Sequence, residues 1–215
     1  MSYPELFAIA SAVMAILMIG SGRLRINLLF YAFQTVFASA VTASCGLVSG
    51  DHQLYSIGLA ILLVKAIGVS AFIAWITKRI GVTSDPGTLI PVPLSMHASI
   101  VFLVVAHLLA SQLPHLKGQD HSLGGATAAI SLLLTGTLFM LARKVAVSQI
   151  IGFLTMENGI YLFALTQTRG MPMMVELGIL LDVLVVVMIA GLIIFRIKRS
   201  FEHIDVTLLT ELKEY

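Results

Sequence analysis

The sequence predicts an all-α membrane protein, a bundle of about seven helices that cross a lipid bilayer. Of its 215 residues, 58% are hydrophobic and only 11% are charged, whereas roughly 25% are charged in an ordinary soluble domain. Its mean hydropathy is +0.99. The apolar runs are about 20 residues long, which suits a membrane-spanning helix, whereas a barrel strand would alternate over about ten residues. Since only helices and closed barrels satisfy the backbone in lipid, a helix bundle follows.

Hydropathy and basic turns divide the chain into seven predicted spans. The first has no positive charge before its apolar core, which favours a retained helix over a cleaved signal peptide. Because the turns are short, we expect one transmembrane domain over residues 1–199 and a cytoplasmic tail over residues 200–215 that docks or caps. The spans cover residues 3–19, 26–48, 54–76, 92–113, 123–142, 147–166 and 173–195.

The basic residues predict how the chain is oriented. Lys and Arg in short loops favour the cytoplasmic side of a membrane. Of the 13 basic residues, Lys117 and Arg169 fall on one side of the predicted bundle, Lys65 lies within a span, and the rest fall on the other side. This bias predicts an outer N-terminus and a cytoplasmic C-terminus. The residues on the cytoplasmic side are Arg23, Arg25, Lys78, Arg79, Arg143, Lys144, Arg196, Lys198, Arg199 and Lys213.

The first three and last three spans share a pattern. Each set consists of an apolar helix, a basic turn, a helix with a central polar residue and a helix with a buried charge. The two sets cover residues 1–80 and 123–199, and the span of residues 92–113 connects them. Gln34 in the first set corresponds in position to Glu157 in the second set, and Lys65 corresponds to Asp182. One interpretation is a parallel internal duplication, a common origin of membrane proteins.

Three charged residues fall at one depth in the predicted membrane. At a rise of about 1.5 Å per residue, Glu157, Lys65 and Asp182 all lie near the bilayer midplane, each about ten residues into its span. Gln34 lies slightly toward the cytoplasm, and Glu176 lies near the outer end of its span. Charges at one depth on different helices indicate a row along the membrane plane rather than a pore through it.

These buried charges have two interpretations. Ionisable residues inside a membrane usually belong to an ion or proton pathway, and a neighbouring opposite charge decides whether a buried group stays ionised. We therefore predict that Lys65 pairs with Glu157 or Asp182 in a proton pathway. The alternative is a buried ion pair that only fixes helix register, which often adds little net stability. Glu176 can instead extend to the outer interface.

Two histidines and one cysteine limit the remaining chemistry. His97 and His107 lie ten residues apart in one span, which is about 1000° of helical turn and leaves them on different faces. They suit a proton relay or ordinary helix hydrogen bonding, but no metal pair. With Cys45 alone, the chain can form neither an internal disulfide nor an iron–sulfur ligand set. We expect no cofactor, no metal and no nucleic-acid partner.

The chain resembles the membrane component E family of hydrogenase-4 and related formate hydrogenlyase complexes. The resemblance rests on SGRLRINLLFYAFQTVF, ILLVKAIGV, ARKVAVSQIIGFLTMENGIYLFAL, PMMVELGILLDVLVVVMIAGLIIFRI and IDVTLLTEL. The last three spans also resemble the K subunit of respiratory complex I, which has three helices and a carboxylate in its second and third. Glu157 matches the second-helix acid; Glu176 and Asp182 both suit the third, and depth favours Asp182.

The resemblance implies a non-catalytic subunit of a group 4 nickel–iron hydrogenase or formate hydrogenlyase complex in a bacterial or archaeal cell (inner) membrane. Its partners would be antiporter-like and other membrane subunits and, indirectly, a soluble hydrogenase arm that holds the nickel and iron–sulfur clusters. Redox energy would then change the protonation or pairing of Glu157, Asp182 and Lys65. The alternatives are a structural membrane anchor that assembles antiporter-like subunits and a self-contained small-ion transporter.

Overall fold

The computed structural model describes residues 3–80, 88–113 and 122–167, together with the single positions 178, 185 and 191. Within these residues every regular element is a helix, and extended pairing is limited to one isolated bridge between Thr88 and Arg143. The predicted all-α class is confirmed. The helices are α1 (Tyr3–Ile19), α2 (Leu24–Ser49), α3 (His52–Ile61), η1 (Leu62–Val69), α4 (Ser70–Ile80), α5 (Val92–Ser111), α6 (Leu123–Ala142) and α7 (Ala146–Gln167).

The helices follow the predicted spans closely. α3, η1 and α4 form one continuous helical rod in place of the third span, and the last span, 173–195, lies almost wholly outside the described residues. In the described part of the chain, four helical stretches are long and apolar enough to cross a membrane: Leu24–Ser49, His52–Arg79, Val92–Ser111 and Leu123–Ala142. α1 is apolar but has only 17 residues. The polar residues of α7 lower its hydropathy, and it is not among the four.

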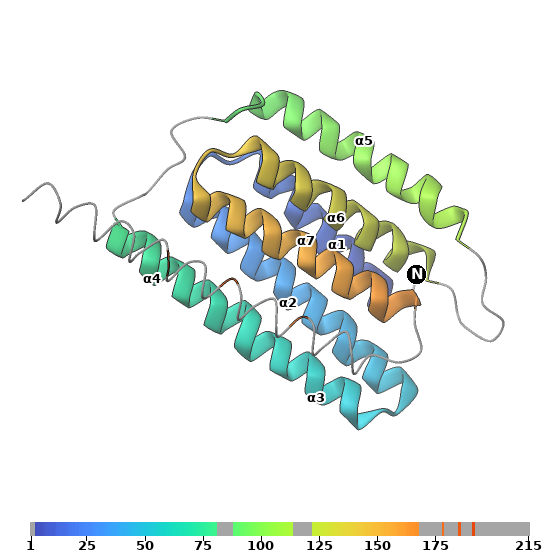
Figure 1. The fold of residues 1–215 in the computed structure, drawn as a ribbon. Coiled ribbons are helices and arrows are strands. Elements are labelled where there is room, and N and C mark those ends of the chain that lie inside the picture. The colour runs from blue at the N-terminus through green and yellow to red at the C-terminus, as the bar shows by residue number, and fades with distance from the viewer. Residues whose placement is uncertain are drawn as a thin grey trace, which may run out of the picture.

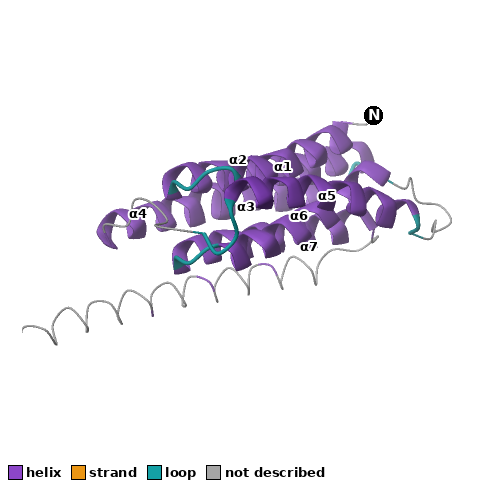
Figure 2. Cartoon of the chain, turned by 90° about the horizontal axis from the view of Figure 1, so that it is seen from above, coloured by secondary structure: helices purple, strands orange, loops and turns teal. Residues whose placement is uncertain are grey.

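A four-helix bundle of α1, α2, α6 and α7 forms the centre of the protein (Figure 1). The helix pairs α1–α2, α6–α7, α1–α6 and α2–α7 all contact one another; α5 lies outside against α6, and the rod α3–η1–α4 lies outside against α2. Seen from above, the helix axes are roughly aligned (Figure 2). This arrangement brings α7 between α2 and α6 and fixes the helix that carries Glu157.

Glycines let α6 and α7 approach each other closely. A Cβ atom on Gly136 would lie 2.5 Å from the backbone nitrogen of Met156, and one on Gly152 would lie 2.7 Å from that of Met140. Both distances are too short for any larger residue. In lipid there is no hydrophobic driving force between helices, so helices associate through close van der Waals packing, which small residues allow. The α6–α7 contact is therefore a close backbone approach that sets the rotation of α7.

Arg143, which directly follows α6, binds the end of α1 at one face of the bundle. Its side chain is buried, its Nη2 donates to the carbonyl oxygens of Ile19 (3.0 Å) and Ser21 (2.7 Å), and its guanidinium lies 4.6 Å from the centre of the Phe139 ring. It thereby satisfies carbonyls at the end of α1, where a helix leaves them without partners. We call this face the basic end; its basic residues are Arg23, Arg25, Lys78, Arg79, Arg143 and Lys144.

Candidate functional site

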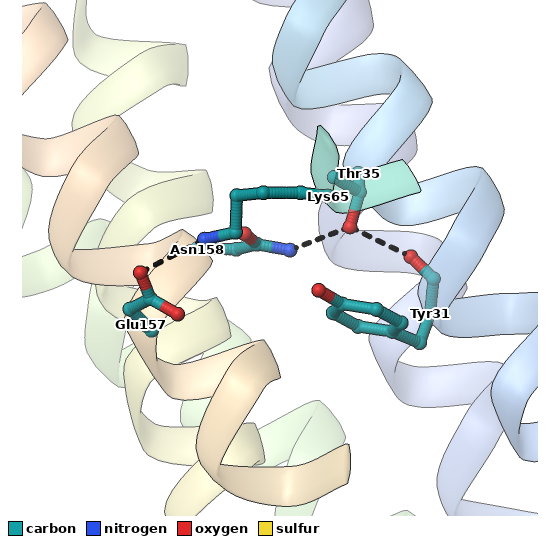
Figure 3. A network of polar contacts seen from close by, with 5 residues as sticks. All are labelled: Tyr31, Thr35, Lys65, Glu157 and Asn158. Atoms are coloured by element: carbon teal, nitrogen blue, oxygen red, sulfur yellow. Dashed lines mark hydrogen bonds and ion pairs between the residues drawn. The ribbon is translucent and has the colours of Figure 1, made fainter. Parts of the chain in front are cut away.

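Lys65 and Glu157 form an ion pair in the interior of the bundle (Figure 3). Lys65 Nζ lies 2.9 Å from Glu157 Oε1, and the two side chains are only 10% and 3% exposed. The sequence left Glu157 and Asp182 open as partners of Lys65, and the structure pairs Lys65 with Glu157. The pair joins the outer rod to the central bundle, so residues 92 positions apart in the chain meet in one buried contact.

Lys65 lies in the middle of a π-helix, η1. The wider π turn is rare, and its short occurrences are frequent at functional sites. In η1 the side chains of Leu63, Val64 and Ile67 are exposed, whereas Lys65 and Ala66 are buried. The segment thus presents apolar side chains outward and directs the lysine into the protein. These eight residues contain no proline and one glycine, Gly68, and the sequence predicted a plain helix here.

A chain of hydrogen bonds joins α7 to α2 beside the ion pair. Asn158 Nδ2 donates to Thr35 Oγ1 (2.9 Å), and Thr35 Oγ1 donates to the carbonyl oxygen of Tyr31 (3.0 Å). Figure 3 shows the Tyr31 ring extending from α2 with its hydroxyl directed toward the side of Glu157. Farther from the basic end, Thr42 Oγ1 lies 2.8 Å from the hydroxyl of Tyr161. These contacts hold α2 and α7 in one register.

Gln34 is fully buried at the same interface, on the side of the ion pair that faces the basic end. Its Oε1 accepts from Thr155 Oγ1 at 3.4 Å, and Thr155 precedes Glu157 by two residues. Its Nε2 has no hydrogen-bond partner among the described residues. The structure therefore brings Gln34 close to the helix turn that carries Glu157, slightly toward the basic end, as its predicted depth indicates.

One described position of the last predicted span also lies beside the pair. A Cβ atom built on Gly178 would lie 3.4 Å from Glu157 Oε1, so the backbone at this glycine passes next to the carboxylate. Val185 is buried in the apolar cluster that includes Ile150 and Ile151. Two predicted site residues of this span, Glu176 and Asp182, lie outside the described residues.

The two predicted relay histidines lie on α5, away from the centre of the bundle. His97 is exposed, and its Nδ1 lies 2.6 Å from the carbonyl oxygen of Pro93 in its own helix. His107 is also exposed, and its Nδ1 lies 3.4 Å from Thr127 Oγ1 of α6. Their hydrogen bonds connect them to α5 and α6. Of the predicted site residues that the structure describes, it brings together Lys65, Glu157 and Gln34.

Burial strengthens the Coulomb attraction within the ion pair, but it also removes water from both charged groups, which costs free energy. At 2.9 Å and an effective dielectric constant of about 20, the Coulomb attraction is on the order of 6 kcal/mol. The loss of hydration on burial offsets much of that attraction. A proton added to Glu157 would remove the attraction while the desolvation of Lys65 remains. The arrangement can therefore convert one protonation event into a large local change in electrostatic energy.

Comparison with known proteins gives distant relatives over nearly the whole chain. An uncharacterized protein of Mycobacterium tuberculosis is 28% identical over 97% of this chain and 95% of its own length. Hydrogenase-4 component E of Escherichia coli K12 is 25% identical over 88% of this chain and 87% of its own length. The chain is a distant homologue of that component. No family model matches it, and no solved structure does.

Proposed function

We propose that this chain is a non-catalytic membrane subunit of a complex I-related nickel–iron hydrogenase or formate hydrogenlyase complex. Within that complex, the Lys65–Glu157 pair belongs to a proton-translocation path. The observation that carries the proposal is the buried ion pair itself, in which Lys65 of a π-helix lies 2.9 Å from Glu157 of α7. Intramembrane charges are costly and usually mark ion or proton paths. The distant homology to hydrogenase-4 component E supports the hydrogenase complex as its setting.

The proposal includes a topology. Seven spans would cross a bacterial or archaeal cell (inner) membrane, with the N-terminus outside and the C-terminus in the cytoplasm. The basic end then faces the cytoplasm, because basic residues in short loops favour that side. Residues 1–80 and 123–199 form the two three-helix sets, residues 92–113 connect them, and residues 200–215 form the cytoplasmic tail. Antiporter-like and other membrane subunits would surround this domain, and a soluble hydrogenase arm would supply the redox chemistry.

The mechanism follows from the geometry of the pair. Proton uptake by the Glu157 carboxylate neutralises it, and the Lys65 ammonium loses the attraction of that charge. The loss favours a new partner for Lys65 or release of its proton. We propose Asp182 as the next acid, since it follows Gly178 by four residues and Gly178 lies beside Glu157. Glu176 remains the second candidate for that role, and His97 and His107 are proposed relay positions on the α5 surface.

A structural anchor is the second candidate function. The pair joins η1 to α7, and such a contact can fix an interface without moving a proton. Replacing both charges, as Lys65→Met with Glu157→Gln, separates the two functions because it removes both charges of the ion pair at once. An anchor predicts that the double variant restores assembly and proton translocation together. A proton path predicts restored assembly with translocation still lost.

A further inference from the structure

Three buried polar side chains on α2 and α7 carry atoms that have no hydrogen-bond partner among the described residues. Asn27, Gln34 and Ser148 are each fully buried. Both amide atoms of Asn27, the Nε2 of Gln34 and the Oγ of Ser148 make no hydrogen bond to any described residue. Buried polar groups in proteins are nearly always paired, with protein or with ordered water. Three such groups on two adjacent helices therefore indicate partners other than the atoms of the surrounding helices.

The register of the two helices places these groups in layers. α2 and α7 both begin at the basic end, and the Gln34–Thr155 and Thr42–Tyr161 contacts show that they run parallel. Asn27 precedes Gln34 by seven residues, and Ser148 precedes Thr155 by seven residues. Seven residues make almost two full turns, a rise of about 10.5 Å. Asn27 and Ser148 therefore lie at one depth, on the faces that also carry Gln34 and Thr155.

The interface is asymmetric about the ion pair. Toward the basic end it holds the unsatisfied atoms of Asn27, Ser148 and Gln34. Farther from that end the polar groups of α2 bond directly to α7: Thr35 accepts from Asn158, and Thr42 shares a hydrogen bond with Tyr161. Of these two parts, the first needs additional hydrogen-bonding partners. The polar atoms that need partners therefore lie between the ion pair and the basic end, and so toward one side of the membrane.

We propose that ordered water binds along the α2–α7 interface between Asn27 and Gln34 and connects the basic end to Glu157. Water suits these atoms, because an amide offers both donors and acceptors and a buried water makes about three hydrogen bonds. Tyr31 lies between them on α2, four residues after Asn27, with its hydroxyl directed toward the side of Glu157. The water chain gives protons access to the ion pair from the basic end alone.

Proton transfer along this chain balances simply. A hydronium ion at the basic end gives a proton to the first water, and each water releases one proton as it accepts another. The last water transfers a proton to the Glu157 carboxylate, where a new O–H bond forms. The hydronium ion that started the transfer is left as a water molecule. Phenol and hydroxyl groups both donate and accept hydrogen bonds, so Tyr31 and Ser148 can continue the chain. No other reactant is needed.

The first test is a cryo-electron microscopy map of the chain in its complex, at a resolution that shows ordered water. We expect water within hydrogen-bonding distance of Asn27 and Ser148, and of Gln34 Nε2. A dry interface at these atoms would overturn the proposal. The map is independent of Glu157 function, so a failed proton role for Glu157 and a dry interface are separate outcomes.

The second test measures proton translocation in variants that remove the polar lining. Asn27→Leu keeps the side-chain size and removes the amide, and Ser148→Ala removes a single oxygen atom. We expect each to lower the rate of proton translocation roughly tenfold, about 1.4 kcal/mol in barrier height, with assembly retained. Ser131→Ala is the matched control, because this α6 hydroxyl is also buried and also without a partner among the described residues.

The outcomes separate the water path from the proposed function on which it rests. If translocation in Asn27→Leu and Ser148→Ala equals that of Ser131→Ala, the path is overturned, even where Glu157 variants lose translocation. A dry, structural Asn27 predicts instead that Asn27→Leu raises the thermal midpoint and leaves translocation unchanged, because an unpaired buried amide is removed. Should Asn27→Leu fail to fold, Ser148→Ala decides the question alone.

Discussion

Replacing Glu157 with glutamine keeps the side-chain volume and removes the carboxylate that lies 2.9 Å from Lys65 Nζ. Loss of one partner from a buried ion pair destabilises a protein by about 3–5 kcal/mol. For a chain of this size, 1 kcal/mol lowers the thermal midpoint by roughly 2–4 °C. We therefore expect Glu157→Gln to lower the midpoint by at least about 6 °C, and Lys65→Met to do the same.

The double variant tests whether these losses come from the pair. Replacing both partners of a buried ion pair with uncharged residues is often close to neutral. We expect Lys65→Met with Glu157→Gln to regain most of the stability. Two single losses of about 3 kcal/mol each would then give a coupling energy of at least about 4 kcal/mol in a double-mutant cycle. The assay is thermal unfolding of the full chain in lipid nanodiscs. Additive losses, within about 0.5 kcal/mol, would refute the energetic coupling of the two residues.

Three further predictions concern the frame around the pair. Arg143→Met removes two hydrogen bonds to carbonyls at the end of α1; we expect a loss of about 3 kcal/mol, because bonds to charged donors are each worth about 1.5–3 kcal/mol, measured by thermal unfolding. Gly152→Ala places a Cβ atom 2.7 Å from a backbone nitrogen and should lower the thermal midpoint, whereas Gly22→Ala, with nothing described within 4 Å, should not. A reporter enzyme that works only in the cytoplasm should be active when fused after Tyr215, and one that works only in the periplasm should be inactive there. Activity of the periplasmic reporter would contradict the topology.

Much of the helical architecture could be predicted from the sequence, because in lipid each span must satisfy its own backbone. The predicted span 3–19 matches α1, and 123–142 matches α6. The depth estimate also brought Lys65 and Glu157 to one level, and the structure joins them. The contact between Lys65 and Glu157 also depends on helix rotation, which the close α6–α7 approach sets for α7 and which the hydropathy pattern does not contain.

Two features of the frame could not be predicted. The eight residues of the π-helix at Lys65 are as apolar as the α-helical turns on either side, so the hydropathy pattern gives no signal for the wider turn. Arg143 was predicted as a basic loop residue that marks the cytoplasmic side. The structure buries it against the carbonyls of Ile19 and Ser21, far earlier in the chain, and such backbone partners leave no trace in the pattern of side chains.

Proton translocation by the double variant tests the central claim most directly. The proposed hydrogenase complex, carrying Lys65→Met and Glu157→Gln, would be purified, reconstituted in liposomes and assayed both for proton movement with a pH-sensitive dye and for hydrogenase turnover. A proton path through the pair predicts normal assembly and turnover with translocation lost. Normal translocation in the same assembled complex would contradict the claim and leave the Lys65–Glu157 pair as a structural contact.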